Sequence, residues 1–338
     1  MKATVLRAPG EAAVDQVPEP ETTGEGNILL KVRKIGLCGS DLNSYRGRNP
    51  LVTYPRILGH EIAATVAVLN PNHPELQPGT AVTVSPYTSC GRCASCRRGR
   101  PNACQFNQTL GVQRDGALAE FIAVPADRLY RAHLSLKELC LVEPLTVGFH
   151  AAARGRVTPA DTVAIIGCGG VGLGAVAGAA FRGATVIGID VEDTKLATAR
   201  KAGATHTINS ASENLHTRLS EITGGHGPDV FIEAIGLPQT FRAAVEEVAF
   251  TGRVVYIGYA EQEVAYETRL FVQKELDILG SRNAQPDDFR DVIRMLEEHR
   301  FPVDDAITHM VAMDEAPQIL AAWDRDPARF GKIMIDVS

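Results

Sequence analysis

The sequence predicts an α/β protein of two domains, one β-rich and mostly antiparallel and one built on a doubly wound parallel sheet. The chain has 338 residues, more than a single hydrophobic core usually organises. Short apolar runs separated by Pro and Gly fill the first 145 residues, which is typical of antiparallel strands. From about residue 160 to 281, apolar strands alternate with helical stretches, which indicates βαβ units.

The β-rich domain is predicted to combine the start and the end of the chain. Its strands are short apolar runs bounded by turn residues. The last such run, 332–337, is expected to return to this domain after two helical stretches. We therefore assign residues 1–145 and 282–338 to it and residues 146–281 to the parallel domain. Its expected strands are 27–36, 62–69, 80–85, 118–125 and 332–337, and the two helices are 289–299 and 316–326.

The parallel domain is predicted from strands that are each followed by a helix. This order requires crossover connections, so the strands are expected to run parallel with helices on both faces. The expected strands are 162–167, 185–190, 206–209, 229–236, 252–259 and 276–281, and the helices are 170–182, 194–202 and the stretches after Ser212 and Gln239.

Composition and charge argue against several classes of function. Hydrophobic residues make up 45% of the chain and charged residues 22%, as in ordinary globular proteins. A formal net charge of −6 disfavours general attraction to nucleic acid or to an anionic membrane. The N-terminus MKATVLRAPG lacks the apolar segment of a signal peptide, so we expect a cytoplasmic protein with reduced cysteines. The apolar run 162–180 is too rich in glycine for a membrane span.

A glycine motif predicts dinucleotide binding in the parallel domain. GCGGVG at 167–172 follows an expected strand, opens an expected helix, and is followed by Asp190 at the end of the next strand. The first glycine permits the turn, the second lets the pyrophosphate approach, and the third lets helix and strand pack closely. Asp190 favours NAD over NADP, although it can instead cap the following helix. The predicted cofactor residues are Gly167, Gly169, Gly170, Val171, Gly172 and Asp190.

Four of the seven cysteines lie close together, at Cys90, Cys93, Cys96 and Cys104. Four thiolates are the ligands of a closed tetrahedral zinc site, which has no position open for substrate. An iron–sulfur cluster is disfavoured because the last gap is long and no proline follows Cys104. A nucleic-acid-binding ribbon is disfavoured because no aromatic residues lie among the nearby arginines. The spacing therefore predicts a structural zinc lobe, and the chemistry must lie elsewhere.

A second candidate metal site is suggested by GLCGSD at 36–41 and LGHEI at 58–62. A catalytic zinc typically takes Cys, His and carboxylate ligands and keeps one open position. Cys38 and His60 by themselves are a weak signal, since a buried cysteine and a hydrogen-bonded histidine would give the same pattern.

The order of GLCGSD, GHE, the four-cysteine lobe, EPL and the glycine loop resembles the zinc-containing medium-chain dehydrogenase/reductase family over essentially the whole chain. Through YPRILGHEI, VSPYTSCGRC and GSRNAQPDDF, the chain is most similar to the polyol and sugar-acid branch, which includes sorbitol dehydrogenase and the L-galactonate and L-gulonate 5-dehydrogenases. The resemblance implies a GroES-like catalytic domain, a Rossmann domain, an active site in the cleft, and two zinc ions with NAD as cofactors.

The resemblance also implies functions for individual residues. Cys38 and His60 match the first two ligands of the catalytic zinc. Glu143 matches a carboxylate that reaches the metal directly or through water, and Glu61 matches a second acid that can replace it, so the third ligand stays open. Asp41 matches an acid that holds His60 in the correct tautomer. The alternatives are a helix N-cap for Asp41 and, for Glu143, stabilisation of a helix N-terminus.

The implied reaction is hydride transfer between a secondary alcohol of a polyol or sugar acid and NAD, with Ser40 accepting the alcohol proton. Arg282 is expected to bind a substrate carboxylate, the cofactor, or an acid across the domain hinge. Other residues expected to line the cofactor are Ile235, Gly236, Ile257 and Gly258. Asn43 stands where many relatives carry a proton-relay histidine, which predicts a pH profile without a histidine limb.

Other functions remain open at this point. The substrate can instead be threonine, glucose or a simple alcohol, and the chain can be an idle NAD-binding sensor or partner module, or a zinc-free quinone reductase. The presence of Cys38, His60, Glu143 and Ser40 disfavours both the idle module and the quinone reductase. A homodimer or homotetramer is expected from the resemblance.

Overall fold

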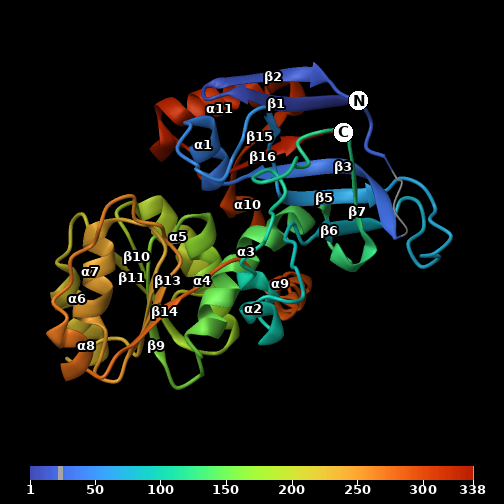
Figure 1. Ribbon diagram of the computed structural model, residues 1–338. Helices are drawn as coiled ribbons and strands as arrows, with labels where there is room; N and C mark the ends of the chain where they lie inside the picture. The colour runs from blue at the N-terminus through green and yellow to red at the C-terminus, as the bar shows by residue number, and fades with distance from the viewer. Residues whose placement is uncertain (22–25, 338) are drawn as a thin grey trace. The chain divides into compact units, whose positions relative to one another are not determined.

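The computed structural model describes residues 1–21 and 26–337 and divides the chain into two compact units (Figure 1). The first unit is Met1–Glu143 with Val303–Ser338, and the second is Pro144–Pro302. Residues 282–302, which we assigned to the β-rich domain, therefore belong to the second unit. The reason is a buried contact within that unit, where Nδ1 of His150 lies 2.8 Å from Oδ2 of Asp288.

The first unit is built on a seven-stranded sheet in which most neighbours are antiparallel (Figure 1). The strand order is β15-β16-β3-β5-β6-β8, and β7 also pairs with β3. A smaller sheet has the order β2-β1-β4. The strands are β1 Lys2–Ala8, β2 Glu11–Gln16, β3 Asn27–Leu37, β4 Arg56–Ile57, β5 Glu61–Val66, β6 Ala81–Val84, β7 Phe121–Pro125, β8 Leu129–Arg131, β15 Ile307–Ala312 and β16 Lys332–Asp336.

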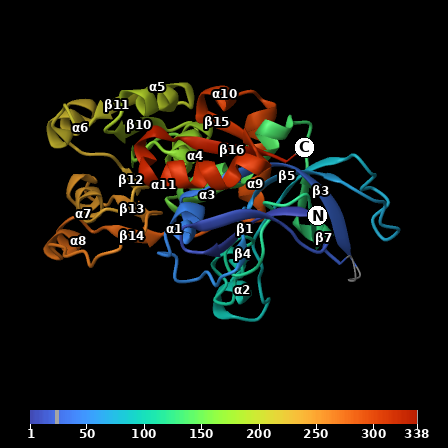
Figure 2. The same ribbon diagram turned by 90° about the horizontal axis from the view of Figure 1, so that it is seen from above.

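Helices of the first unit cover its sheets and connect its strands. Helix α11 packs on β2 (Figure 1) and on α1 (Figure 2), and Leu320 and Trp323 on one face of α11 are buried. The helices are α1 Gly39–Tyr45, α2 Ala94–Arg97, α10 Val303–Ala306 and α11 Ala316–Arg325, and α3 Leu136–Arg154 runs from the first unit into the second. Four short 3₁₀ turns complete it, η1 Pro101–Ala103, η2 Ala126–Arg128, η3 Met313–Glu315 and η4 Pro327–Arg329.

Two strand registers determine what meets at one end of the first unit's large sheet. Gly36 of β3 pairs with Glu61 of β5, so the residue after β3 lies beside the residue before β5. Ile333 of β16 pairs with Leu37 of β3, which brings the start of β16 to the same place. The predicted return of the C-terminal strand to this unit is therefore confirmed.

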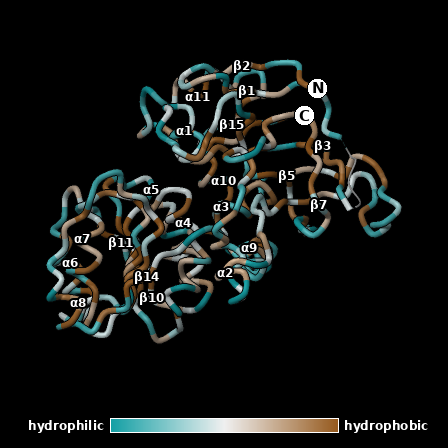
Figure 3. Tube along the Cα trace, in the orientation of Figure 1, coloured by the Kyte–Doolittle hydropathy of each residue, from teal (hydrophilic) through white to brown (hydrophobic). Residues whose placement is uncertain are grey.

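The second unit is a six-stranded sheet in which all pairings are parallel, in the order β11-β10-β9-β12-β13-β14. The order reverses between β9 and β12, so right-handed crossovers place α4 and α5 on one face and α7 on the other. Hydrophobic residues follow the strands of this sheet (Figure 3). Its elements are β9 Thr162–Ile166, α4 Gly170–Phe181, β10 Thr185–Asp190, α5 Asp193–Lys201, β11 His206–Asn209, α6 Leu215–Thr223, β12 Val230–Glu233, α7 Pro238–Glu247, β13 Arg253–Tyr256, α8 Arg269–Gln273, β14 Asp277–Gly280 and α9 Pro286–Glu297.

Each unit has its own buried core. In the first, the core lies between the large sheet and its helices and includes Ile35, Ile62 and Ile335. In the second, it includes Ile187, Phe231 and Val254 from the central strands. Within the described part of the chain, we find no helix with the length and apolar character that a membrane span requires.

Candidate functional site

The registers of β3 and β5 bring Cys38 and His60 together, because Cys38 follows β3 and His60 precedes β5. Ligand atoms of Cys38, His60 and Glu61 all lie within 4.8 Å of one another. Nδ1 of His60 is buried and has no hydrogen-bond partner among the described residues. A thiolate, an imidazole and a carboxylate at this separation are the donor set of a catalytic zinc.

Asp41 lies beside His60 but is not hydrogen-bonded to it, since Oδ1 of Asp41 is 3.8 Å from Nδ1 of His60. Instead, Oδ2 of Asp41 accepts a hydrogen bond from the backbone N–H of Cys38 at 2.9 Å, and Oδ1 accepts one from Gly59 at 3.4 Å. Asp41 therefore holds the backbone at Cys38 and at the residue before His60. Ser40, on the same helix turn, is half-buried.

The two candidate acids have different partners. Both oxygens of the fully buried Glu61 accept from the ammonium of Lys332, at 2.5 and 2.7 Å. A Cβ on Gly36 would lie 1.9 Å from Oε2 of Glu61, so only glycine fits beneath this carboxylate. The buried Glu143 of α3 accepts a hydrogen bond from the hydroxyl of Tyr87.

The acidic groups around Cys38 and His60 are buried, and burial disfavours their charged forms. Burial raises the pKa of Asp41 and of Glu143, an effect that His60 partly opposes. Burial and the neighbouring Glu143 raise the pKa of Tyr87 well above its usual value. Burial alone would lower the pKa of His60, but Asp41 and the hydrogen bond with Cys38 outweigh it and leave that pKa well above its ordinary value. Because buried acids are costly unless a cation compensates them, this group of side chains fits a divalent metal ion.

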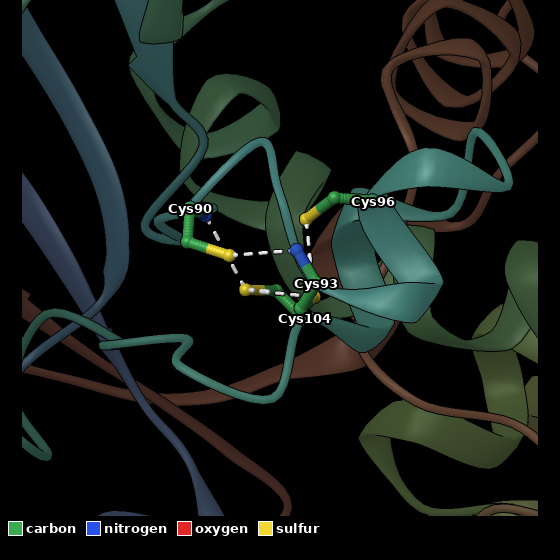
Figure 4. A group of neighbouring side chains, drawn as sticks. All are labelled: Cys90, Cys93, Cys96 and Cys104. Atoms are coloured by element: carbon green, nitrogen blue, oxygen red, sulfur yellow. Dashed lines mark hydrogen bonds between the residues drawn. The ribbon is translucent and has the colours of Figure 1, made fainter.

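The four cysteines of the lobe converge on one point (Figure 4). Sγ of Cys93 lies 3.5 Å from that of Cys96 and 3.8 Å from that of Cys104. Tetrahedral zinc with zinc–sulfur bonds of about 2.3 Å requires sulfur separations of about 3.8 Å. Backbone N–H groups of Cys90 and Phe106 donate to the sulfur of Cys104, which supports a thiolate there.

The lobe thiols also show why a cation is needed. Hydrogen bonds from the Ser95 hydroxyl and from nearby backbone N–H groups lower the pKa of Cys93 to about 5. Desolvation and the neighbouring thiol of Cys93 raise the pKa of Cys96 to about 11. Four thiolates this close repel one another, so their full deprotonation requires a cation between them.

The glycine loop lies at the carboxyl end of β9, before α4. Gly167 has φ of +95°, and a Cβ on Gly172 would lie 1.7 Å from the carbonyl oxygen of Gly167. A Cβ on Gly169 would meet nothing within 4 Å, so the space beside this glycine is open. Open space at a helix N-terminus is what a pyrophosphate needs.

Asp190 ends β10 and its carboxylate holds the adjoining loops. Oδ2 accepts from the backbone N–H of Cys168 in the glycine loop at 2.8 Å, and Oδ1 accepts from Val191 and Glu192. The carboxylate therefore stabilises the turn after β10 and fixes the glycine loop. It does not cap the following helix, because α5 begins at Asp193 and its N-cap residue is Glu192. Val191, beside it, is 58% exposed.

The other predicted cofactor residues lie in the second unit. Ile235 follows β12 and is 44% exposed, and a Cβ on Gly167 would lie 2.6 Å from its side chain. Ile257 and Gly258 follow β13, and their backbone N–H groups donate to the carbonyl of Glu233. Arg282 follows β14 and is half-buried. Thus the metal-ligand candidates belong to the first unit, and Arg282 belongs to the unit that carries the glycine loop.

Comparisons with known proteins agree with this geometry. The profile described as "Alcohol dehydrogenase GroES-like domain" matches residues 24–133, and "Zinc-binding dehydrogenase" matches residues 170–298. A sorbitol dehydrogenase from Bacillus subtilis is 38% identical, with 83% of this chain and 81% of that protein covered. The L-galactonate-5-dehydrogenase of Escherichia coli is 31% identical, with 91% of each covered. The chain belongs to the zinc-binding alcohol dehydrogenase family.

A solved structure supports the family assignment over the full length. An alcohol dehydrogenase from Escherichia coli, in complex with NADH, superposes with a TM-score of 0.90 at 28% identity, covering 100% of this chain and 99% of that one. The expected family and two-domain fold class are confirmed. This zinc-binding dehydrogenase is an oxidoreductase that acts on a CH–OH group, with zinc and a nicotinamide dinucleotide as cofactors.

Sequence reasoning missed several residues of the dehydrogenase site. Lys332 and Gly36 enclose Glu61, Tyr87 binds Glu143, and the buried Glu233 holds the backbone at Ile235. Gly36 lies in GLCGSD and Tyr87 in VSPYTSCGRC, two motifs that carry the family resemblance. These motifs could therefore have indicated that both residues belong to the site. Lys332 had no signal, because 271 residues separate it from Glu61.

Proposed function

We propose that the chain oxidises a secondary alcohol of a polyol or sugar acid with NAD as hydride acceptor, an aldonate oxidised at C5 being one candidate. The observation that carries the proposal is the convergence of ligand atoms from Cys38, His60 and a carboxylate within 4.8 Å of one another. The similarity to a sorbitol dehydrogenase and to an L-galactonate-5-dehydrogenase supports the substrate class.

In this proposal, Cys38 and His60 hold the catalytic zinc together with Glu143 or Glu61. Bound zinc supplies Lewis-acid chemistry, which lowers the pKa of an alcohol. Ser40 accepts a hydrogen bond from the substrate hydroxyl and relays its proton by passing its own hydroxyl hydrogen on to water. Tyr87 orients Glu143 by donating its hydroxyl hydrogen. The lobe cysteines hold a second zinc, which stabilises the loop.

The dinucleotide is proposed to bind along the carboxyl edge of the parallel sheet. Gly169 leaves room for the pyrophosphate at the N-terminus of α4. Asp190 favours NAD, because a buried carboxylate repels the 2′-phosphate of NADP. Ile235, Ile257 and Gly258 line the nicotinamide end, and bound NAD accepts the hydride.

A substrate panel tests the proposal. We expect NAD reduction, followed by its absorbance, with alditols or aldonates but much less with threonine or short alcohols, and lower activity with NADP. A strong chelator is expected to abolish turnover, because the alcohol then loses the Lewis acid. Turnover that survives complete removal of zinc, or that occurs only with short alcohols, would contradict the proposal.

The pH dependence of alcohol oxidation tests whether a histidine relays the proton, because Asn43 stands where many relatives carry that histidine. Asparagine does not titrate, so we expect kcat/KM to show no limb centred near pH 6.5, the ordinary range of histidine. The measurement is a pH profile from about 5.5 to 9 in buffers of constant ionic strength. A limb near pH 6.5 that disappears in a histidine variant such as His150→Asn would show that another group replaces the relay.

Two further expectations from the sequence stay predictions. They are a homodimer or homotetramer and a cytoplasmic location. Sedimentation of the purified chain tests the first.

A further inference from the structure

Glu233, at the carboxyl end of β12, is a fully buried carboxylate whose two oxygens have different surroundings. Oε1 accepts hydrogen bonds from the backbone N–H groups of Ile235 and Gly236, at 2.9 and 2.7 Å, and from the hydroxyl of Thr240 at 2.7 Å. Oε2 is also buried, and it has no hydrogen-bond partner among the described residues. Leaving a buried carboxylate oxygen unpaired costs free energy, which favours a role in binding over one in stability.

The negative charge of Glu233 is not balanced by a neighbouring cation. Its three hydrogen-bond donors are all neutral groups, and in the described part of the chain no basic side chain pairs with it. By contrast Asp161, another buried acid of this unit, pairs with Arg253. An unbalanced charge in a buried place acts on its neighbourhood more strongly than a charge in water does.

Glu233 lies on the side of the parallel sheet that is proposed to bind the nicotinamide half of the dinucleotide. The glycine loop after β9 marks the pyrophosphate, and Asp190 at the end of β10 marks the ribose of the adenosine half. The strand order in this region is β10-β9-β12-β13. In the proposed binding mode, the other half of the dinucleotide therefore extends over the carboxyl ends of β12 and β13.

The carboxylate touches the backbone that is proposed to line this half. A Cβ on Gly258 would lie 2.5 Å from Oε2 of Glu233 and 2.4 Å from the backbone nitrogen of Gly236. The carbonyl of Glu233 also accepts from the N–H groups of Ile257 and Gly258, at 2.9 and 3.3 Å. Because Gly258 has no side chain, its backbone lies directly against the unpaired oxygen.

We propose that Glu233 is a specificity residue that raises the affinity of the chain for NAD relative to NADH. The proposal rests on the function proposed above. The nicotinamide ring carries a positive charge in NAD and none in NADH. An unbalanced carboxylate beside the loop that lines this ring therefore stabilises the oxidised cofactor and leaves the reduced one almost unaffected.

The test measures the dissociation constants of NAD, NADH and ADP-ribose by calorimetric titration of the zinc-loaded chain. Glu233→Gln removes the charge but keeps an oxygen that can accept the same three hydrogen bonds. In this variant we expect the affinity for NAD to fall by roughly 5-fold and that for NADH to change by less than about 2-fold. ADP-ribose lacks the ring, so its affinity should stay at the wild-type value.

Glu233→Asp separates the charge from the hydrogen bonds. The shorter side chain keeps the charge but loses contacts at Oε1, so both cofactors should bind more weakly while the ratio of their affinities stays as in the wild type. This ratio does not depend on the fraction of competent protein, because that fraction scales both dissociation constants equally. A variant that is partly unfolded therefore still gives a result.

Asp229→Asn is the matched control, because it removes the same charge at the other end of β12. There Oδ2 of Asp229 accepts from the backbone N–H of Thr162 at 2.7 Å, and the affinity ratio should not change. The proposal is wrong if Glu233→Gln keeps the wild-type ratio, or if Asp229→Asn shifts it by the same factor. A wild-type chain that binds both cofactors but oxidises neither alditols nor aldonates would instead refute the proposed function.

Discussion

Replacing Cys38 by serine is expected to remove the catalytic zinc and to lower kcat/KM by more than about 100-fold. Loss of a residue that only supports a metal ligand already costs up to about 100-fold in affinity or activity, and Cys38 is itself a proposed ligand. The lobe cysteines are untouched, so zinc content should fall from two ions per chain to one, in line with the two candidate ligand groups among the described residues. Metal analysis of the purified variant, beside its steady-state kinetics, checks both numbers.

Cys140→Ser is the matched control for this prediction. Cys140 is also buried in the first unit, and its Sγ donates to the carbonyl of Glu61, 3.4 Å away, a contact that serine can keep. Burial raises the pKa of its thiol far above the ordinary value, and Cys140 belongs to neither candidate ligand group among the described residues. We expect two zinc ions and near-normal turnover. The prediction fails if Cys38→Ser retains both ions and full turnover.

Two substitutions in the glycine loop are expected to differ in their effects. Gly172→Ala should lower both stability and NADH affinity, whereas Gly169→Ala should lower NADH affinity alone. In Gly172→Ala, the new Cβ would lie 1.7 Å from the carbonyl oxygen of Gly167. Backbone must therefore move, which costs about 1–3 kcal/mol or more. We expect a lower melting temperature and NADH binding weakened by more than about 10-fold, since 1.4 kcal/mol corresponds to a factor of ten. Thermal unfolding and fluorescence titration with NADH measure the two effects.

Gly169→Ala provides the contrast within the same loop. Nothing lies within 4 Å of the new Cβ, and the residue has φ of −74°, which alanine adopts freely. The free energy of unfolding should therefore change by less than about 0.5 kcal/mol. NADH should still bind more weakly, because the methyl group occupies the space proposed for the pyrophosphate. Unchanged affinity for NADH in this variant would mean that the phosphates do not approach Gly169.

Most of the parallel unit could be predicted from the sequence, including its start near residue 144, but its end at Pro302 could not. The strand ending in Gly167 and the helix from Gly170 were both predicted, because apolar strands, glycine motif and helix follow one another locally. The expected strand 229–236 is shorter in the structure, ending at Glu233, since Glu233 turns the chain by binding the N–H groups of Ile235 and Gly236. The place of 282–302 depends on the contact of His150 with Asp288, which are 138 residues apart.

Some residues of the candidate site could also be predicted from the sequence, and others could not. Cys38, His60 and the lobe cysteines lie in short motifs, so the sequence could identify them. Strand β15 was not predicted, because its side chains alternate between half-buried and exposed without a fully buried face. Asp41 was expected to hold the His60 ring, but in the structure it binds backbone N–H groups instead. Partners such as Lys332 come from pairing of distant strands, which a local pattern does not reveal.

The proposed catalytic site has one metal ion held by Cys38, His60 and an acidic side chain. Anomalous diffraction at the zinc absorption edge, from crystals of the zinc-loaded and active chain, can locate this ion. We expect two peaks per chain, one among the four lobe sulfurs and one beside Sγ of Cys38 and the imidazole of His60. A single peak in the lobe, from protein that oxidises its alcohol at full rate, would contradict it.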